Sequence, residues 1–480
     1  MSYQPAIGLE IHVELKTKSK MFCSCLNDPD EKQPNVNICP VCTAQPGTLP
    51  VINEEALRKV IKTGLALNCQ ISKHSQFDRK NYFYPDLPKG YQISQLYRPL
   101  CKNGYLEIGG KKVRIREIHL EEDTGKLIHP EGADYSLVDF NRAGIPLMEL
   151  VTEPDLASAQ EARAFAQELH LIMHYLDVSD ADMEKGQMRV EVNISLSSGS
   201  KLGTKVEIKN LNSFRSVERG VNFEIERQEK LLRAGKKVIQ ETRGWHDVKE
   251  ITFSQRAKEE AHDYRYFPEP DLPPLHLAKI LVDGIRAEMP ELPQKRRARL
   301  RREYGIEENN VEILIYHKDL GEYFEKIISE FPARLAPEKL LRLVKLAANY
   351  LISDLQGLLK GSSIKDKNFL ISPDNFADFI GLIERGDISS KIAKVVLEEM
   401  LKSGADPSHI IREKGLAQIT NEKEIEQAVQ EVIAKNPKAI EDYKNGKQNA
   451  LQFLIGQAMA QTRGKADPAI LTKIIRSAII

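Results

Sequence analysis

A change of hydrophobic pattern near residue 292 limits the folds that are open to this chain. Before it, strand-like runs with period-two alternation, such as 7–15 and 190–196, are interspersed with helical patterns. After the proline-rich stretches 267–274 and 289–293, the sequence is rich in Lys, Arg, Glu, Leu and Ile, and its periodicity is helical. We therefore expect an α+β region followed by an all-helical one.

Breaks in the pattern divide the chain into three expected domains. Residues 1–292 should form a domain in which helices pack on a largely antiparallel sheet. A break at Gly404-Ala-Asp-Pro407 divides the rest into an all-helical domain, residues 293–404, and a small helical tail, residues 405–480. Amphipathic helices are predicted over residues 54–67, 158–176, 338–359 and 374–384.

Composition and charge exclude several classes of protein. Hydrophobic residues make up 41% of the chain, charged residues 29% and aromatic residues 6%, which is unlike a collagen, a disordered protein or a disulfide scaffold. Lys and Arg number 69, as do Asp and Glu, so the net charge does not indicate a nucleic-acid partner. We see no signal peptide and no apolar run near the roughly 18 residues that span a membrane. We expect a cytoplasmic protein without a membrane partner.

Four of the six cysteines lie in one short segment. Cys23-Ser-Cys25 and Cys39-Pro-Val-Cys42 are two close pairs separated by thirteen residues, a pattern typical of a tetrahedral zinc knuckle. Because sulfur fills all four positions, no place remains for a water ligand, so the expected zinc is structural and a zinc hydrolase is excluded. The alternative is four reduced thiols in a surface loop.

Acidic residues and histidines gather in strand-like segments. The candidates are Glu10, His12 and Glu14, then the His119-Leu-Glu-Glu-Asp123 motif after a strand-like run over 111–118, and Glu149. Period two places the first three on one face of a strand, where they either face solvent or bind cations. Several carboxylates with an imidazole suit Mg²⁺, which prefers oxygen ligands and shares them with substrate phosphates.

Two further segments mix cations with other polar or aromatic side chains. Residues 78–92 contain two prolines that forbid a helix, and we expect an ordered functional loop. Its Lys80 and Lys89 could hold phosphates and its tyrosines could flank an adenine or a terminal tRNA base; alternatively, the loop packs under its own side chains. Residues 205–215 either form a second polar cluster or the start of a helix capped at Ser213.

The tail offers one more candidate surface, and several common motifs are missing. An apolar stripe in residues 443–468 is flanked by Lys444, Lys447, Arg463 and Lys465, which either grip phosphates or belong to a solvated helix. The sequence contains no GxxxxGKS or GxxxxGKT loop, no GxGxxG turn and no GxSxG elbow. A P-loop, a Rossmann crossover and a serine nucleophile are therefore excluded.

Long motifs over essentially the whole chain resemble the B subunit of the tRNA-dependent amidotransferase, which amidates misacylated Glu-tRNA(Gln) or Asp-tRNA(Asn). The similarity is carried by residues 7–15, 79–86, 91–95, 119–123, 263–270 and 464–468. It implies a cradle-like catalytic domain, a helical domain and a YqeY-like tail that contacts tRNA. The expected boundaries near residues 292 and 405 agree with this arrangement.

The resemblance implies an ATP-dependent carbon–nitrogen ligase with glutamine as amido donor. Mg-ATP would phosphorylate the side-chain carboxylate of the amino acid on tRNA, and ammonia would displace the phosphate to give Gln-tRNA(Gln) or Asn-tRNA(Asn). An amidase subunit (A) would supply the ammonia, and a small linker subunit (C) would complete a heterotrimer. The competing hypothesis is a non-catalytic scaffold that binds tRNA and delivers it to the amidase.

The resemblance also implies roles for single residues. His12, Glu122 and Glu149 fall where the family places magnesium ligands. Glu10 and Glu121 lie beside them, as candidates for a second cation or for guiding ammonia.

Two more residues join the expected catalytic set, and the knuckle stays outside it. Lys80 would stabilise phosphate charge. Glu191 stands where relatives often carry Asp. Many relatives lack the four-cysteine knuckle at residues 23–42, which supports a structural role for its zinc.

Overall fold

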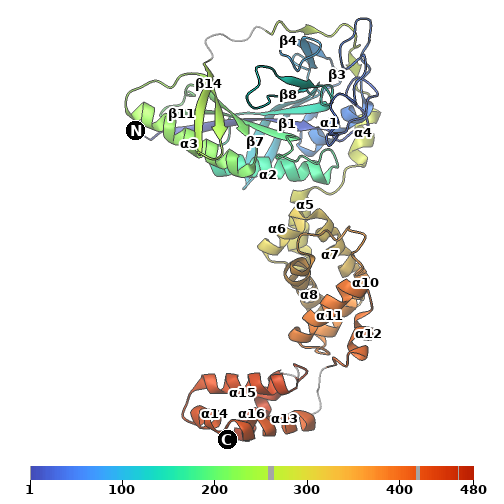
Figure 1. The fold of residues 1–480 in the computed structure, drawn as a ribbon, viewed down its shortest axis with the longest axis vertical. Helices are drawn as coiled ribbons and strands as arrows, with labels where there is room; N and C mark the ends of the chain where they lie inside the picture. The colour runs from blue at the N-terminus through green and yellow to red at the C-terminus, as the bar shows by residue number, and fades with distance from the viewer. Residues whose placement is uncertain (1, 258–263, 418–421, 463, 467, 480) are drawn as a thin grey trace. The chain divides into compact units, whose positions relative to one another are not determined.

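The computed structural model describes residues 2–257, 264–417, 422–462, 464–466 and 468–479 (Figure 1). By its internal contacts the chain divides into two units, Met1–Pro293 and Gln294–Ile480. The first unit is built on mixed sheets with helices, and the second is helical, so the expected α+β class with a helical remainder is confirmed. Among the described residues, no helix is long and apolar enough to cross a membrane.

A nine-stranded sheet forms the centre of the first unit, in the order β14-β13-β12-β11-β1-β10-β7-β6-β2. Its strands are β1 (Gln4–Glu14), β2 (Gln70–Ile71), β6 (Cys101–Ile108), β7 (Lys111–Glu122), β10 (Pro146–Thr152), β11 (Met188–Ser197), β12 (Val206–Leu211), β13 (Glu241–His246) and β14 (Ile251–Ala257). Among the strand pairs that the described residues form in this sheet, only β12–β13 is parallel, so the largely antiparallel sheet is confirmed.

Three helices belong with one face of this sheet: α1 (Glu54–Ala66), α2 (Ala159–Tyr175) and α3 (Phe214–Arg233). Figure 1 shows α2 and α3 running along that face. The apolar residues of β1 are buried in one core with these helices, from Ile7 to Val13 at every second position. This alternation leaves the polar residues of β1 on the other face. At the start of α3, the Ser213 side chain accepts a hydrogen bond from the Ser216 amide, so the capped helix is confirmed.

Smaller strands complete the first unit. They are β3 (His74–Ser75) with β16 (Leu275–His276), β8 (Lys126–Ile128) with β9 (Leu137–Asp139), and the three-stranded sheet β15 (Phe267–Pro268), β4 (Asp78–Asn81) and β5 (Tyr91–Ser94). The prediction of a loop over residues 78–92 is therefore wrong at both ends of the segment, which pair as strands. Lys80 lies in one of these strands, β4. Strand β5 packs against β7, and helix α4 (Lys279–Ala287) packs against α1.

Strand β7 is longer than its sequence pattern predicts. The acidic motif at residues 119–123 was expected to follow the strand, but β7 continues through it to Glu122. The reason is non-local, since β10 pairs with β7 as far as Pro146 opposite Glu122. Because successive side chains of a strand point to opposite faces, neighbouring residues of the motif have different surroundings.

The second unit consists of helices. They are α5 (Pro293–Tyr304), α6 (Glu308–Tyr316), α7 (Lys318–Glu330), α8 (Pro337–Asn349), a π-helical turn (Tyr350–Leu355), α9 (Gln356–Leu359), α10 (Pro373–Glu384), α11 (Ser390–Ser403), α12 (Pro407–Glu413), α13 (Glu422–Lys435), α14 (Pro437–Lys444), α15 (Gln448–Gln461) and α16 (Pro468–Ile479). The helix predicted over residues 338–359 thus changes to π geometry in its second half.

Helices α13 to α16 share a hydrophobic core of their own, which includes Ile425, Leu454 and Ile475. Helix α12 packs against α10 and α11 instead. The division into domains of residues 1–292, 293–404 and 405–480 stays a prediction, and the packing of α12 favours a tail that begins after residue 413.

Candidate functional site

Five adjacent strands each contribute one glutamate to a row on the sheet, which we call the carboxylate row. In sheet order its members are Glu207 of β12, Glu191 of β11, Glu10 of β1, Glu149 of β10 and Glu121 of β7. The register places Glu10 directly opposite Glu191. Like charges on neighbouring strands destabilise a sheet, so an ordinary surface would not be expected to collect them.

Two histidines lie among these carboxylates because of the strand register. Glu149 is paired with His12 of β1 on one side and with His119 of β7 on the other. The Nε2 atom of His119 lies 2.7 Å from Glu149 Oε2, and that of His12 lies 3.6 Å from the same oxygen. His12 Nε2 is also 3.7 Å from Glu121 Oε1. A single glutamate therefore joins the two imidazoles.

The ligand atoms are close enough together to bind cations. Within each of three groups, one ligand atom per residue lies within 4.8 Å of the others. The groups are Glu10, His12 and Glu149; His119, Glu121 and Glu149; and Glu10, Glu191 and Glu207. Carboxylate oxygens with one imidazole fit a divalent cation of the magnesium type.

Burial and mutual repulsion change the protonation of the acidic groups. Burial raises the pKa of Glu10 to about 7, and the charges of Glu149 and Glu191 contribute to the rise. Burial also raises the pKa of Glu121. Burial works against the charged form of Glu149 too, but His119 and His12 outweigh it and hold the pKa of Glu149 well below its ordinary value. The row thus retains protons that a bound cation would displace.

The carboxylates in turn raise the pKa of both imidazoles. Burial disfavours the charged form of His12, but the neighbouring Glu149 and Glu121 outweigh burial and raise the pKa of His12 to about 9. The same balance, with Glu149 as the main partner, raises the pKa of His119 to about 9. A metal ligand must be neutral imidazole, so cation binding here would release protons.

Two lysines lie beside the carboxylate row. Burial opposes the charge of Lys80, but Glu121 and Glu149 outweigh it and raise the pKa of Lys80. Its Nζ atom lies 5.2 Å from the ring centre of Tyr264. At the other end of the row, Lys209 Nζ is 2.8 Å from Glu191 Oε2. A lysine ammonium group therefore lies at each end of the row.

Glu122 has a different environment from Glu121. Lys89 Nζ lies 2.6 Å from Glu122 Oε1, and the Ile93 amide donates a hydrogen bond to the same oxygen. Glu122 belongs to none of the three groups of possible ligands, whereas Glu121 accepts a hydrogen bond from Ser94 Oγ and faces His12. The structure thus brings together Glu10, His12, Glu121, Glu149 and Glu191 and places Glu122 apart from them.

Three residues of this site lie in segments that the sequence reasoning singled out, but none of the three was given a role of its own. His119 lies in the quoted acidic motif, and Glu207 and Lys209 lie in the segment 205–211. In that segment apolar residues (Val206 and Ile208) alternate with charged ones (Glu207 and Lys209), as in a strand with one polar face. This alternation is the signal that could have identified Glu207 and Lys209. The pairing of β12 with β11 brings them to the row.

A second charged group lies next to the row. Arg189 of β11 is paired with His12 in the register, and its guanidinium lies 2.8 Å from Asp123 Oδ2. Burial disfavours the charge of Asp123, but Arg189 and Arg142 outweigh it and lower the pKa of that carboxyl. Asp123 is therefore an anion held by arginines and not a spare metal ligand.

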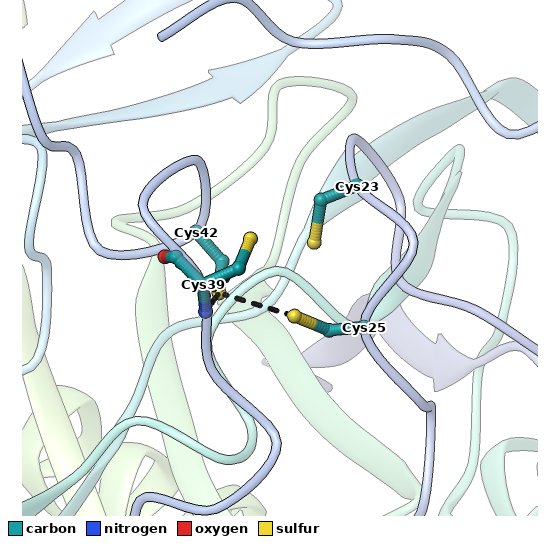
Figure 2. Close-up of side chains that lie close together, drawn as sticks. All are labelled: Cys23, Cys25, Cys39 and Cys42. Atoms are coloured by element: carbon teal, nitrogen blue, oxygen red, sulfur yellow. Dashed lines mark hydrogen bonds between the residues drawn. The ribbon is translucent and has the colours of Figure 1, made fainter.

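The four knuckle cysteines converge from two loops, as Figure 2 shows. Cys42 Sγ lies 4.0 Å from Cys25 Sγ and 3.8 Å from Cys39 Sγ. Tetrahedral zinc with bonds of about 2.3 Å holds its sulfurs about 3.8 Å apart, so the donor set fits zinc. The Cys39 amide also donates to Cys42 Sγ, and the Cys23 thiol beside it lowers the pKa of Cys42 to about 5, although burial opposes this. Such donors stabilise a thiolate.

Three of the four tail cations lie among the described residues, at or near the ends of α14 and α15. Lys444 is exposed, and Lys447 pairs with Asp442 at 2.9 Å. Lys465 is half-buried, and Arg463 lies outside the described residues. The apolar stripe between them, including Leu451 and Leu454, is core.

The fold and the site together define the class of protein. Residues 5–283 match the family described as the GatB/GatE catalytic domain, and residues 322–479 match the GatB domain. The chain therefore belongs to the GatB family. The resemblance on which the site residues were chosen is confirmed at this level.

Relatives of known name extend over nearly the whole chain. One is the B subunit of the aspartyl/glutamyl-tRNA(Asn/Gln) amidotransferase of Thermotoga maritima, 49% identical over 99% of each chain. Proteins of the same name from Caldicellulosiruptor bescii and Persephonella marina are each 48% identical, again over 99% of both chains.

Proposed function

We propose that this chain is the B subunit of an aspartyl/glutamyl-tRNA(Asn/Gln) amidotransferase and that its first unit carries the ligase site. In the proposed reaction the γ-phosphoryl group of ATP passes to the side-chain carboxylate of Glu or Asp esterified to tRNA, and ADP leaves. Ammonia then attacks the acyl carbon, phosphate leaves, and the nitrogen loses a proton. The products are Gln-tRNA(Gln) or Asn-tRNA(Asn).

The carboxylate row is the observation that carries this proposal. Phosphoryl transfer needs positioning and cations more than covalent chemistry, and the row supplies cation ligands without a P-loop. A scaffold that only binds tRNA would gain nothing from like charges placed side by side at a cost in stability.

We assign magnesium to the half of the row that contains the histidines. His12, Glu149 and Glu121 would be its ligands, with substrate phosphate completing the shell. The family resemblance suggested Glu122 as a ligand, but that carboxylate already binds Lys89. We therefore propose that Glu121 takes the ligand position and that the Glu122–Lys89 pair fixes β5 against β7.

The remaining residues suit the later stages of the reaction. Lys80, kept protonated by Glu121 and Glu149, would stabilise the transferring phosphoryl group. Glu10 has a pKa of about 7, which suits a group that accepts a proton from incoming ammonium. Glu191, opposite Glu10 in the register, would hold the second cation or help to guide ammonia.

Partners and a second metal follow from the same proposal. Because the sequence carries no motif for a glutamine-hydrolysing nucleophile, ammonia would come from an amidase subunit (A), with a small linker subunit (C) completing a heterotrimer. The knuckle would hold a structural zinc. Lys444, Lys447, Arg463 and Lys465 of the tail would contact the phosphates of tRNA.

A phosphoryl-transfer assay tests the proposal. The purified chain is incubated with ATP labelled at the γ-phosphate, Mg²⁺ and ammonium, together with Glu-tRNA(Gln), Asp-tRNA(Asn) or uncharged tRNA as the matched control. We expect ADP release and amide formation only with a misacylated tRNA, and the active tRNA identifies the substrate. Tight tRNA binding without either product, even with the partner subunits present, would favour the scaffold.

A further inference from the structure

A lysine lies fully buried beside the cysteine knuckle, where an unpaired charge would be costly. Lys20 is 1% exposed, which makes it as completely buried as the core phenylalanine Phe77. Lysine is almost never buried to this extent unless a partner compensates its charge. The position of Lys20 therefore calls for an anion nearby.

The contacts of Lys20 identify that anion. Its Nζ atom lies 3.8 Å from Cys42 Sγ and 3.2 Å from the Phe140 carbonyl oxygen. In the part of the chain that the structure describes, no carboxylate lies within ion-pair distance of Lys20. The Cys42 sulfur is thus its anionic partner among the described residues, since the Glu122 carboxylate, which also lies close to Gly144, pairs with Lys89 instead.

The surrounding backbone holds the lysine stem in this position. The Lys20 amide donates to the Cys25 carbonyl, and the Met21 amide donates to the Gly144 carbonyl. A Cβ atom on Gly144 would lie 3.5 Å from Cys42 Cβ and 3.6 Å from Lys20 Cδ, so the knuckle, the lysine and this loop are in close contact.

We propose that Lys20 is a positioning residue of the metal centre, which compensates the charge of the zinc–thiolate group and ties the knuckle to the loop before β10. A zinc ion with four thiolates carries a net charge of minus two, and a buried ammonium at 3.8 Å from one sulfur offsets half of it. The second contact, to Phe140, joins the knuckle to the segment that leads into the strand carrying Glu149. This inference rests on the zinc of the proposed function.

The test compares zinc retention in the full chain, Lys20→Met and Lys20→Gln. Methionine keeps the length and bulk of the side chain but removes its charge and its donors, and glutamine keeps a donor without the charge. The matched control is Lys62→Met. Lys62 also donates a hydrogen bond to a backbone carbonyl, but that carbonyl belongs to Leu176, which is not part of the knuckle. Zinc content, the rate of zinc release to a colorimetric chelator and the Co²⁺ absorption spectrum are measured.

We expect Lys20→Met to lower metal affinity about 10- to 100-fold, as loss of outer partners does at other metal sites, while the Co²⁺ spectrum stays tetrahedral. Lys20→Gln should fall between Lys20→Met and the unmodified chain, and Lys62→Met should match the unmodified chain. Unchanged zinc affinity and release rate in Lys20→Met would overturn the role of Lys20. Absence of zinc from the unmodified chain would instead overturn the zinc assignment itself.

A measurement on the unmodified sequence covers the case in which the variants fail to fold. With ¹⁵N-labelled lysine and ¹¹³Cd in place of zinc, we expect one lysine Nζ signal to shift when the metal is exchanged. That signal should belong to Lys20. If no lysine signal responds to the metal, the proposal is wrong.

Discussion

At the residue scale, the site depends on groups whose charges would be unfavourable if each were considered alone. Glu149 keeps its negative charge in a buried position because two imidazoles face it, and the imidazoles keep their protons because of Glu149. Removing one member leaves the others without compensation. Substitutions in this group should therefore affect both stability and activity, and controls must separate the two effects.

The first prediction concerns His12. We expect His12→Ala to reduce phosphorylation of misacylated tRNA by about 100-fold or more, since a metal ion supplies several kcal/mol of charge stabilisation to such a transition state. Affinity for tRNA should be nearly unchanged, because the proposed tRNA contacts lie in the tail. The measurements are single-turnover phosphoryl transfer and filter binding of tRNA.

The control for this variant is His129→Ala, which changes an exposed histidine that contacts Ser136 on the β8–β9 hairpin. It should behave like the unmodified chain. Full phosphoryl transfer by His12→Ala would remove His12 from the magnesium site.

The second prediction concerns pH. In the folded chain the pKa of Glu10 is raised to about 7, that of Glu14 to about 8 and that of His12 to about 9. A raised pKa gives stability that is complete below the ordinary value of the group and is lost as the pH rises through the folded value. We expect the Tm of the magnesium-free chain to fall from about pH 5 to about pH 9. Added Mg²⁺ should reduce the fall, because the cation replaces protons.

Scanning calorimetry on chain dialysed into magnesium-free buffer measures this effect. A chelator is left out, since it would also remove zinc. His12→Ala should show a smaller dependence on pH and on Mg²⁺ than the unmodified chain. A Tm that rises between these pH values, or that ignores Mg²⁺ entirely, would contradict the assignment.

At the scale of elements, the nine-stranded sheet and the knuckle have different sources of order. The strands of the sheet bury alternate apolar residues against α1, α2 and α3, whereas residues 23–42 contain no long helix or strand. A segment with so little regular structure needs a cross-link to hold its shape, and a metal supplies one. Zinc should therefore contribute to stability and not to chemistry.

The third prediction tests this division. In the double variant Cys39→Ser/Cys42→Ser we expect loss of zinc and a Tm that is lower by at least about 5 °C. This corresponds to a loss of about 2 kcal/mol in the free energy of unfolding, because each kcal/mol shifts the Tm of a domain of this size by about 2–4 °C. Elemental analysis and calorimetry measure the two effects. Ser24→Ala, an exposed position between two ligands, is the matched control and should change neither. A variant that retains zinc and stability but loses phosphoryl transfer would contradict a structural role.

At the scale of the whole molecule, the proposed function assigns the chemistry to one unit and a contact with tRNA to the other. The carboxylate row lies entirely within Met1–Pro293, and the tail cations lie within Gln294–Ile480. Helices α13 to α16 have their own core, so they can be removed without opening the core of the first unit.

The fourth prediction concerns removal of the tail. Because α12 packs on α10 and α11, the deletion should start at residue 418 and not at 405. We expect affinity for tRNA to fall about tenfold or more and KM to rise, with kcat at saturating tRNA little changed. Steady-state kinetics and binding at two salt concentrations separate these quantities. Unchanged affinity would remove the tail from tRNA binding.

Point variants make the comparison sharper. Lys444→Ala/Lys447→Ala/Lys465→Ala should reproduce part of the loss and reduce the salt dependence of binding. Lys402→Ala, which removes a lysine of α11 paired with Glu398, is the matched control and should have no effect.

Much of this protein follows from local sequence pattern. Period-two alternation predicted β1 with Glu10 and His12 on one face, and the paired cysteines predicted a convergent thiol cluster. Helical periodicity located α1, α2 and α10 to within a residue or two. These features depend on neighbours in the chain, so the spacing of side chains alone determines them.

The tertiary structure decided which distant strands became neighbours. The pairing of β10 with β7 extended β7 through its acidic motif and put Glu121, rather than Glu122, beside His12. The pairing of β12 with β11 added Glu207 to the row, and the packing of the knuckle placed Lys20 against Cys42. Register and long-range contact depend on pairing between segments far apart in sequence, and no local spacing encodes them.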